Sequence, residues 1–136
     1  RTNRGTGFGF DFDEYFSNAN DNLLTVVQIE STEAVEAAAD IAAVDGVDVL
    51  FVGPFDLSIT MGMMNGFEEP AFKEALDKVA AAAKGAGKAA GILLSKSEEV
   101  ADVVDRGYTF IALGSDSGLV ASGMSANAEA VATFKK

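Results

Sequence analysis

The segment VDVLFVGPFDLS, residues 47–58, decides the fold that this sequence predicts. Its first part, residues 47–52, is short and rich in Val and Leu, which is typical of a strand buried in a parallel sheet. Its second part is a Gly-Pro turn that leads to an acidic residue, Asp56. The earlier segment LLTVVQIE, residues 23–30, has the same form and ends on Glu30. An ionised carboxylate at the end of a buried strand needs compensation, so we expect a metal ion or a catalytic role at both acids.

Apolar runs alternate with helical segments along the chain, and Pro and Gly mark the helix ends. The order predicts a parallel α/β sheet with right-handed crossovers, either a small open sheet or half of a (β/α)₈ barrel. In both folds, active-site groups lie at the C-terminal ends of the strands. We expect strands at 23–29, 47–52, 88–94 and 108–113; helices at 13–22, 31–43, 70–84, 97–105 (capped by Ser95 or Ser97) and 117–134; a loop at 1–12 that packs; and a long loop at 53–66 that could hold a short helical turn.

The amino-acid composition limits the partners and the kinds of metal site that we expect. The 136 residues are 49% hydrophobic, enough for one domain with one core. A net charge of -11 disfavours nucleic acid and anionic membranes as partners. There is no Cys and no His, so a metal ion must bind oxygen, which favours hard cations such as Mg or Mn. No run approaches a membrane span and no signal peptide is visible, from which we expect a cytoplasmic protein.

Glu30 has a structural and a functional interpretation. An acid in the first turn of a helix complements the helix dipole, and this role accounts for most such glutamates. However, Gln28 lies two residues earlier on the same strand, and alternate residues of a strand point to the same side. Gln28 and Glu30 could therefore offer an amide and a carboxylate to one cavity.

The turn before Asp56 is equally open to two interpretations. Gly53 and Pro54 could form an ordinary turn, with Asp56 as an N-cap. Alternatively, backbone N–H groups exposed at a helix start bind carboxylate or phosphate oxygens, and Asp56 beside them holds a cation. Anion donors next to a metal carboxylate suit a 2-oxo acid chelated through its carboxylate and ketone oxygens.

Other features carry less functional weight. Residues 61–64, MGMM, indicate adaptable packing. The GTGFGF at 5–10 neither follows a strand nor opens a helix, as a dinucleotide-binding loop would. Lys88 begins a strand and Lys96 lies in a loop, which disfavours a Schiff-base lysine at either position. Asp116 is expected to cap the last helix.

Four segments carry a resemblance to a known family: VVQIESTEAV (26–35), GVDVLFVGPFDLSITMG (46–62), GKAAGILLS (87–95) and YTFIALGSDSGLV (108–120). They resemble the HpcH/HpaI aldolases, which are metal-dependent (class II) pyruvate aldolases. The resemblance implies a TIM barrel nearly twice this length, of which the chain matches the C-terminal half, about strands five to eight. It also implies an oligomer, usually a hexamer in which the last helix is exchanged between subunits.

The resemblance assigns roles residue by residue. Glu30 and Asp56 would be the protein ligands of a divalent ion (Mg, Mn or Co). Gln28 would contact the substrate ketone or a metal-bound water, and the backbone of Gly53, Pro54 and Phe55 would hold the pyruvate carboxylate. Leu93 and Leu94 would line the aldehyde side of the site. The family's catalytic His and its substrate-binding Arg belong to the other half. Arg1 and Arg4 instead match the Gly-rich segment before strand five.

Residues 1–136 would form a single partial domain, in which 1–22 are a Gly-rich loop and short helix and 23–136 are four βα units. Two classes of function remain for this domain. As an enzyme, it is the metal and pyruvate part of a carbon–carbon lyase that cleaves or forms aldol bonds of 2-oxo acids. The alternative is a non-catalytic half-barrel with a binding or self-associating role. Exposed edge strands and apolar faces predict a partner in either case, a second copy or an N-terminal half-barrel.

Overall fold

The sheet is parallel throughout, and its strands follow one another in chain order. The computed structural model describes residues 3–134. The strands are β1 (Val26–Ile29), β2 (Val49–Val52), β3 (Ala89–Leu94) and β4 (Phe110–Leu113), paired in the order β1-β2-β3-β4. Helical segments connect each strand to the next, as crossovers between parallel neighbours require. The predicted parallel α/β sheet is therefore confirmed.

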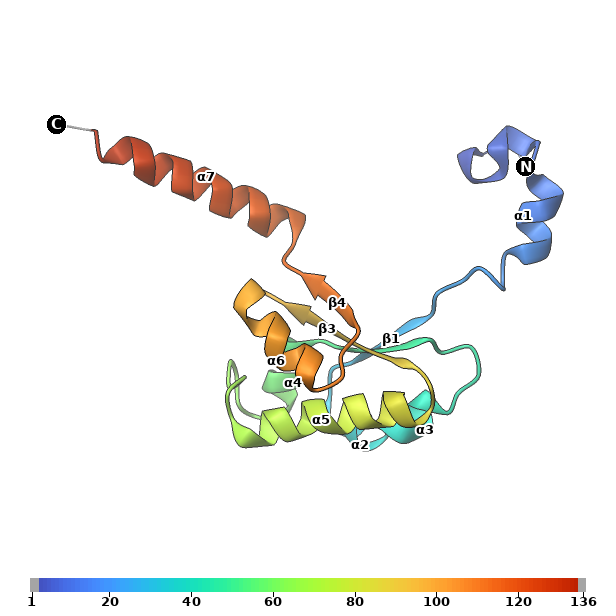
Figure 1. Cartoon of the computed structure of the whole chain (residues 1–136), viewed down its shortest axis with the longest axis horizontal. Helices are drawn as coiled ribbons and strands as arrows, with labels where there is room; N and C mark the ends of the chain where they lie inside the picture. The colour runs from blue at the N-terminus through green and yellow to red at the C-terminus, as the bar shows by residue number, and fades with distance from the viewer. Residues whose placement is uncertain (1–2, 135–136) are drawn as a thin grey trace.

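Helices cover one face of this sheet (Figure 1). They are α2 (Thr32–Glu36), α3 (Ala38–Ala42), α5 (Pro70–Gly85) and α6 (Val100–Asp105). The long helix α5 buries Phe72, Leu76 and Val79, at the helical spacing that the sequence predicts. The core between helices and sheet includes Ile29, Leu50, Val52, Leu57, Phe72, Val79, Ile92 and Tyr108, each at most 2% exposed.

The opposite face of the sheet, which we call the open face, has no helix over it within residues 3–134 (Figure 1). One row of register partners on this face consists of Gln28, Phe51, Gly91 and Phe110. The rings of Phe51 and Phe110 meet edge to face, with centroids 6.0 Å apart. A Cβ at Gly91 would lie 2.7 Å from Phe51 Cδ2 and 3.1 Å from the carbonyl oxygen of Phe110, so this aromatic contact requires glycine between the rings.

Polar contacts fix α5 and α6 to the start of β4. The hydroxyl of Tyr108 donates to the carbonyl of Leu76 at 2.9 Å, and burial raises the pKa of Tyr108. The guanidinium of Arg106 contacts Asp77 of α5 at 2.6 Å and Asp102 of α6 at 3.0 Å. Hydrogen bonds to Asp102 and Asp77 raise the pKa of Arg106. The hydrogen bond from Arg106 in turn lowers the pKa of Asp102.

An N-terminal arm projects from the start of β1 (Figure 1). It contains η1 (Arg4–Gly9) and α1 (Phe12–Asn18), which contact each other. Thr6 is buried within this arm, but Phe8 and Phe10 are 66% and 94% exposed. The prediction that the first twelve residues pack as a loop is therefore wrong for the described part, because no layer of the described chain lies over these aromatic side chains.

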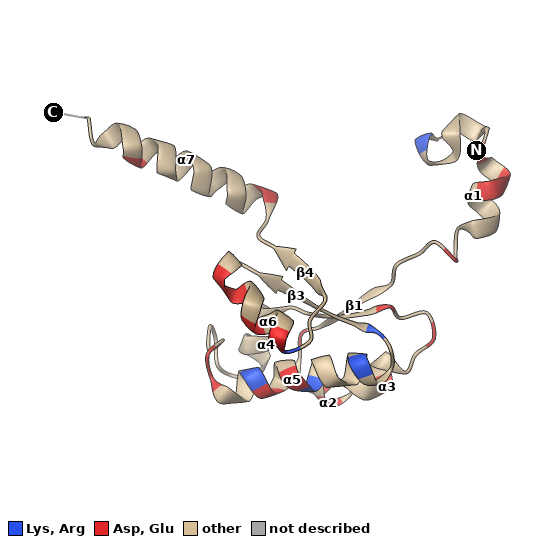
Figure 2. Ribbon diagram, in the orientation of Figure 1, with Lys and Arg blue, Asp and Glu red and all other residues tan. Residues whose placement is uncertain are grey.

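A C-terminal arm projects from the end of β4 and consists of α7 (Asp116–Ala132) (Figure 1). None of its residues is buried, although Leu119, Val120, Met124 and Val131 are large and apolar. Figure 2 shows that the helix is almost free of charged residues. The large apolar side chains of α7 are therefore not covered by any other part of residues 3–134. Between residues 3 and 134, no helix combines the length and hydropathy that crossing a membrane requires.

Several predicted boundaries are corrected by the structure. The helix expected at 31–43 is split into α2 and α3 at Ala37, whose φ of -87° and ψ of 6° leave the helical region. The long loop expected at 53–66, with room for a short helical turn, begins with the seven-residue helix α4 (Pro54–Thr60), because Pro54 fits the first helical position. Helix α6 is preceded by the 3₁₀ turn η2 (Ser97–Glu99), with Lys96 rather than a serine at the cap position. The helix expected at 13–22 is α1 and ends at Asn18, and β1 begins at Val26 instead of residue 23.

Candidate metal and 2-oxo acid site

Glu30 and Asp56 lie at the C-terminal edge of the sheet on neighbouring segments. Glu30 directly follows β1, and Asp56 lies in the first turn of α4, which begins after β2 and Gly53. The side chain of Glu30 rests against Gly53: a Cβ added there would be 3.0 Å from Glu30 Cγ and 3.4 Å from its carboxyl carbon. The missing side chain of Gly53 therefore makes room for the Glu30 carboxylate beside the start of the helix that carries Asp56.

Thr60 joins the other end of α4 to Glu30. The hydroxyl of Thr60 lies 3.1 Å from the main-chain carbonyl oxygen of Glu30. Asp56 lies four residues before Thr60, about one helical turn, and so on the same side of α4. Glu30 thus contacts Gly53, directly before α4, through its side chain and Thr60, the last residue of α4, through its carbonyl.

The start of α4 supplies fewer backbone donors than the resemblance implies. The N–H of Gly53 already donates to the carbonyl of Ile29 at 3.3 Å, and Pro54 has no N–H. Phe55 and Asp56 are in the first turn, where N–H groups have no partner within the helix. Any anion held here would accept from these two N–H groups, so the contribution of Gly53 and Pro54 is the shape of the turn.

The remaining predicted site residues divide between the two faces of the sheet. Gln28 is exposed on the open face, on the same side of β1 as Glu30. Leu93 also lies on the open face and is 44% exposed. Leu94 is 6% exposed and belongs to the core under the helices. A contact between substrate and Leu94 would therefore have to use its backbone.

The oxygen donors near α4 fit a hard cation that keeps part of its water shell. Residues 3–134 contain no cluster of three or more His, Cys, Asp or Glu side chains. Two carboxylates plus water and substrate oxygens are a usual environment for Mg²⁺, which is seldom enclosed by protein ligands alone. Glu30 and Asp56 match that donor set, and the lack of a side chain at Gly53 leaves room for the side chain of Glu30.

The segment that follows Glu30 is held by its own hydrogen bonds. Ser31 caps α2 by accepting from the N–H of Ala34 at 3.2 Å. Hydrogen bonds from its own backbone and from Ser31 lower the pKa of Glu33. At the end of β4, Ser115 caps α7 by accepting from the N–H of Gly118 at 3.1 Å, so the prediction that Asp116 is the cap is wrong.

Sequence reasoning missed the hydroxyl groups that hold α4. Ser58 is fully buried; its hydroxyl donates to the carbonyl of Phe55 at 2.7 Å and accepts from the N–H of Asn65 at 3.2 Å. Thr60 contacts Glu30 and, through its carbonyl, the Thr32 hydroxyl at 3.5 Å. The sequence does contain a signal for Thr60, because it follows Asp56 by one helical turn and so shares its side of a helix. That spacing can be interpreted only once residues 54–60 are recognised as a helix.

Comparison with known proteins now identifies the family. The sequence model of the HpcH/HpaI aldolase/citrate lyase family matches residues 2–123, and the chain belongs to this family. It is 38% identical to the 5-keto-4-deoxy-D-glucarate aldolase of Klebsiella pneumoniae over 135 residues, which are 99% of this chain and 51% of that protein. It is 41% identical to the hydroxypyruvate/pyruvate aldolase of Delftia acidovorans over 84% of this chain and 42% of that protein.

The fold agrees with this assignment. The crystal structure of an HpcH/HpaI aldolase/citrate lyase family protein from Burkholderia cenocepacia superposes with a TM-score of 0.85 and 32% sequence identity. The match covers 96% of this chain and 50% of the Burkholderia chain. The chain therefore spans about half the length of the relatives it matches, and its four βα units correspond to half of a TIM-barrel-like aldolase chain.

Proposed function

We propose that this chain provides the metal and pyruvate part of an aldolase site that cleaves or forms aldol bonds of 2-oxo acids. One observation carries the proposal: the Glu30 side chain rests against Gly53, at the start of the helix that carries Asp56. Aldolases among the relatives support the reaction class. The donor set supports a divalent ion such as Mg, Mn or Co.

Each group has a separate task in this proposal. Glu30 and Asp56 would hold the ion, which supplies Lewis-acid polarisation of the 2-oxo group when bound. The N–H groups of Phe55 and Asp56 would donate hydrogen bonds to the substrate carboxylate, because N–H groups at a helix start favour an anion. Gln28, exposed on the same side of β1, would donate its amide to the ketone or to water. The exposed Leu93 would contact the aldehyde portion of the substrate.

The proton-transfer step needs a group that this sequence lacks. Cleavage of the aldol bond requires a base to remove the proton from the substrate's hydroxyl group as the carbon–carbon bond breaks. The sequence contains no His. In the resembling family, that base and a substrate-binding Arg come from the other half of the barrel. We therefore propose that residues 1–136 are half of one domain and that catalysis requires the second half.

The exposed surface supports such a partner. The chain exposes 9309 Å², whereas a compact monomer of its mass exposes about 6,700 Å². The excess of about 2,600 Å² is larger than the ~800 Å² per partner in a standard interface. Large apolar side chains are exposed on both arms and on the open face, among them Phe10, Met124 and Leu93. An N-terminal half-barrel of this family is the partner that we propose for these surfaces.

Metal binding and turnover test the proposal separately. Titration calorimetry with Mn²⁺ should show one site on the 136-residue chain, lost in Glu30→Gln and in Asp56→Asn. Glu98→Gln, which removes an exposed carboxylate on η2, is the matched control and should bind normally. Release of pyruvate from a 4-hydroxy-2-oxo acid should require Mn²⁺ and an added N-terminal half from a relative. Equal Mn²⁺ binding by all four proteins would contradict the proposed ligands.

A non-catalytic role is the second candidate, and the same exposed surface favours it. Two copies of the chain could cover each other's open faces without forming a reactive site, and the missing His is consistent with that. Native mass spectrometry and the calorimetric titration discriminate the two. A stable dimer that binds no Mn²⁺ would support the self-associating role, whereas Mn²⁺ binding at Glu30 and Asp56 supports the aldolase half.

A further inference from the structure

The hydroxyl of Thr60 is placed between two main-chain carbonyls. It lies 3.1 Å from the oxygen of Glu30 and 2.9 Å from the oxygen of Leu57, three residues earlier in α4. The Leu57 carbonyl already accepts from the N–H of Met61 at 2.9 Å. Within residues 3–134, the Glu30 carbonyl has no donor besides this hydroxyl. The one hydroxyl proton can go to either carbonyl, but within residues 3–134 only the Glu30 carbonyl depends on it for a protein donor.

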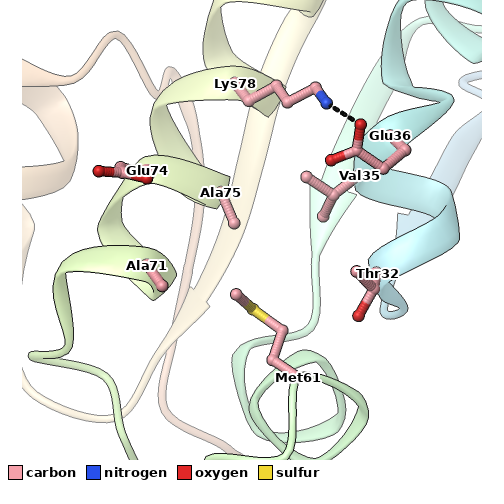
Figure 3. A pocket seen from close by; sticks show the side chains of 8 residues that line it. All are labelled: Thr32, Val35, Glu36, Met61, Ala71, Glu74, Ala75 and Lys78. Atoms are coloured by element: carbon pink, nitrogen blue, oxygen red, sulfur yellow. Dashed lines mark hydrogen bonds and ion pairs between the residues drawn. The ribbon is translucent and has the colours of Figure 1, made fainter.

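A pocket lies beside the end of α4, next to the residues that Thr60 contacts. A cavity of about 180 Å³ lies between α2, the end of α4 and α5, and its lining includes Thr32, Met61 and Ala75 (Figure 3). Figure 3 shows the Met61 side chain extending into the space between α2 and α5. Side chains therefore do not fill the gap beside the end of α4. Across the pocket, Lys78 of α5 pairs with Glu36 of α2 (Figure 3), whereas the end of α4 is linked to its neighbours by the contacts of Thr60 with Glu30 and with Thr32.

From this geometry we infer that Thr60 is a positioning residue for the carboxylate pair. It fixes the peptide plane of Glu30 and, one helical turn along the same side, the helix that carries Asp56. The separation and orientation of the two carboxylates then depend on one hydroxyl that touches neither of them. This role rests on the proposed function, because it sets the affinity of the proposed metal site.

The effect on metal affinity follows from how outer-shell groups act. Residues that orient metal ligands typically change affinity 10- to 100-fold when they are removed. Thr60 is exposed, and its hydrogen bond contributes little to folding compared with the buried core. Loss of the hydroxyl should therefore weaken metal binding strongly while the melting temperature changes little, a combination that a purely structural residue would not produce.

Three variants test the inference on the 136-residue chain. Thr60→Val removes the hydroxyl and keeps the β-branched shape, whereas Thr60→Ser keeps the hydroxyl. Thr133→Val is the matched control, because the Thr133 hydroxyl donates to the carbonyl three residues earlier, at 2.7 Å, on the distant arm α7. By calorimetry, Thr60→Val should raise the Mn²⁺ dissociation constant about tenfold, and Thr60→Ser and Thr133→Val should leave it near the unsubstituted value.

Each result has a defined meaning. In the metal-free chain, the carbonyl ¹³C resonance of Glu30 should shift in Thr60→Val and stay in place in Thr133→Val. Mn²⁺ binding that is equal in the unsubstituted chain and Thr60→Val overturns the role of Thr60 and leaves the proposed ligands standing. Failure of the unsubstituted chain to bind Mn²⁺ overturns the proposed metal site and the inference together. An unmoved Glu30 resonance overturns the hydrogen bond itself.

Discussion

The two faces of the sheet differ in how much of their apolar surface this chain can bury by itself. On the helix-covered face, Leu50 and Val52 are fully buried and Ile92 is 2% exposed. On the open face, Leu93 is 44% exposed and Phe110 is 37% exposed, although both are as apolar as their covered neighbours. The first face explains why the half-barrel holds together. The second leaves apolar side chains uncovered within residues 3–134, and it is the surface that the proposed partner would cover.

Alanine substitution of two adjacent leucines should give the largest difference in stability between the two faces. Leu94 lies in the core and Leu93 on the open face, so the same substitution samples each face. Leu94→Ala should lower the free energy of unfolding by about 2–5 kcal/mol, and Leu93→Ala by less than about 0.5 kcal/mol. Urea unfolding followed by circular dichroism measures both. Equal losses would mean that the open face is already covered in solution, for example by a second copy.

Gly91 tests whether the open face is ordered without a partner. A Cβ there would meet Phe51 at 2.7 Å and Val49 Cγ1 at 2.9 Å, so Gly91→Ala should destabilise the chain by about 1–3 kcal/mol. Gly85→Ala is the control, because nothing lies within 4 Å of a Cβ at that position near the end of α5. That substitution should be neutral or stabilising by up to about 1 kcal/mol. A harmless Gly91→Ala would show that the Phe51 ring is free to move away.

The stability that Tyr108 contributes on the helix-covered face should depend on pH. Tyr108→Phe should cost about 1 kcal/mol at neutral pH because it removes the hydrogen bond to Leu76. Burial raises the pKa of Tyr108 above its ordinary value of 10.0. The unfolded chain therefore ionises first, and the contribution of Tyr108, present below pH 10.0, is lost as the pH rises above it. In urea unfolding, the difference between the two proteins should shrink in alkaline solution; a constant difference would contradict the buried hydroxyl.

The ion pair of Asp102 should give the smallest effect. Its side chain is 54% exposed, so the pair with Arg106 should contribute about 0.3–0.5 kcal/mol at neutral pH. Arg106 lowers the pKa of Asp102 below the ordinary value of 3.8. The contribution is therefore present above that pH and is lost as the pH falls through the lowered pKa. Thermal unfolding of Asp102→Asn and the unsubstituted chain should differ slightly at neutral pH and converge in acid.

The sequence predicted the layers of the fold better than its site. Periodicity identified the four strands and α5, because burial on the helix-covered face imposes a pattern on residues such as Phe72 and Val79. It allowed a short helical turn within 53–66 but not the bounds of α4, because Gly53-Pro54 also suits a turn and seven residues are too few to show a helical period. The break at Ala37 had no signal at all, since no Gly or Pro lies within 31–43.

For the candidate site, the sequence located the acids but not what positions them. Glu30 and Asp56 were found because a polar residue after an apolar run is conspicuous. The contact of Glu30 with Gly53 and the hydrogen bond from Thr60 join residues that are far apart in the chain. Such contacts depend on the pairing of β1 with β2, so they can be recognised only after the fold is built. Whether Gln28, Leu93 and the turn at Gly53 contact substrate stays a prediction.

The pairing of each strand with its successor also governs how this chain can fold. The register joins Val26 to Val49, Val49 to Ala89 and Gly91 to Phe110. Each strand therefore pairs with the strand that follows it in the chain, and no pairing requires a later segment. The strands can therefore be added to the sheet one at a time, in the order in which they are synthesised. The slowest closure should join β2 to β3, because α4 and α5 both lie between them. The proposed metal site would then take shape early, since β1, β2 and α4 precede that step.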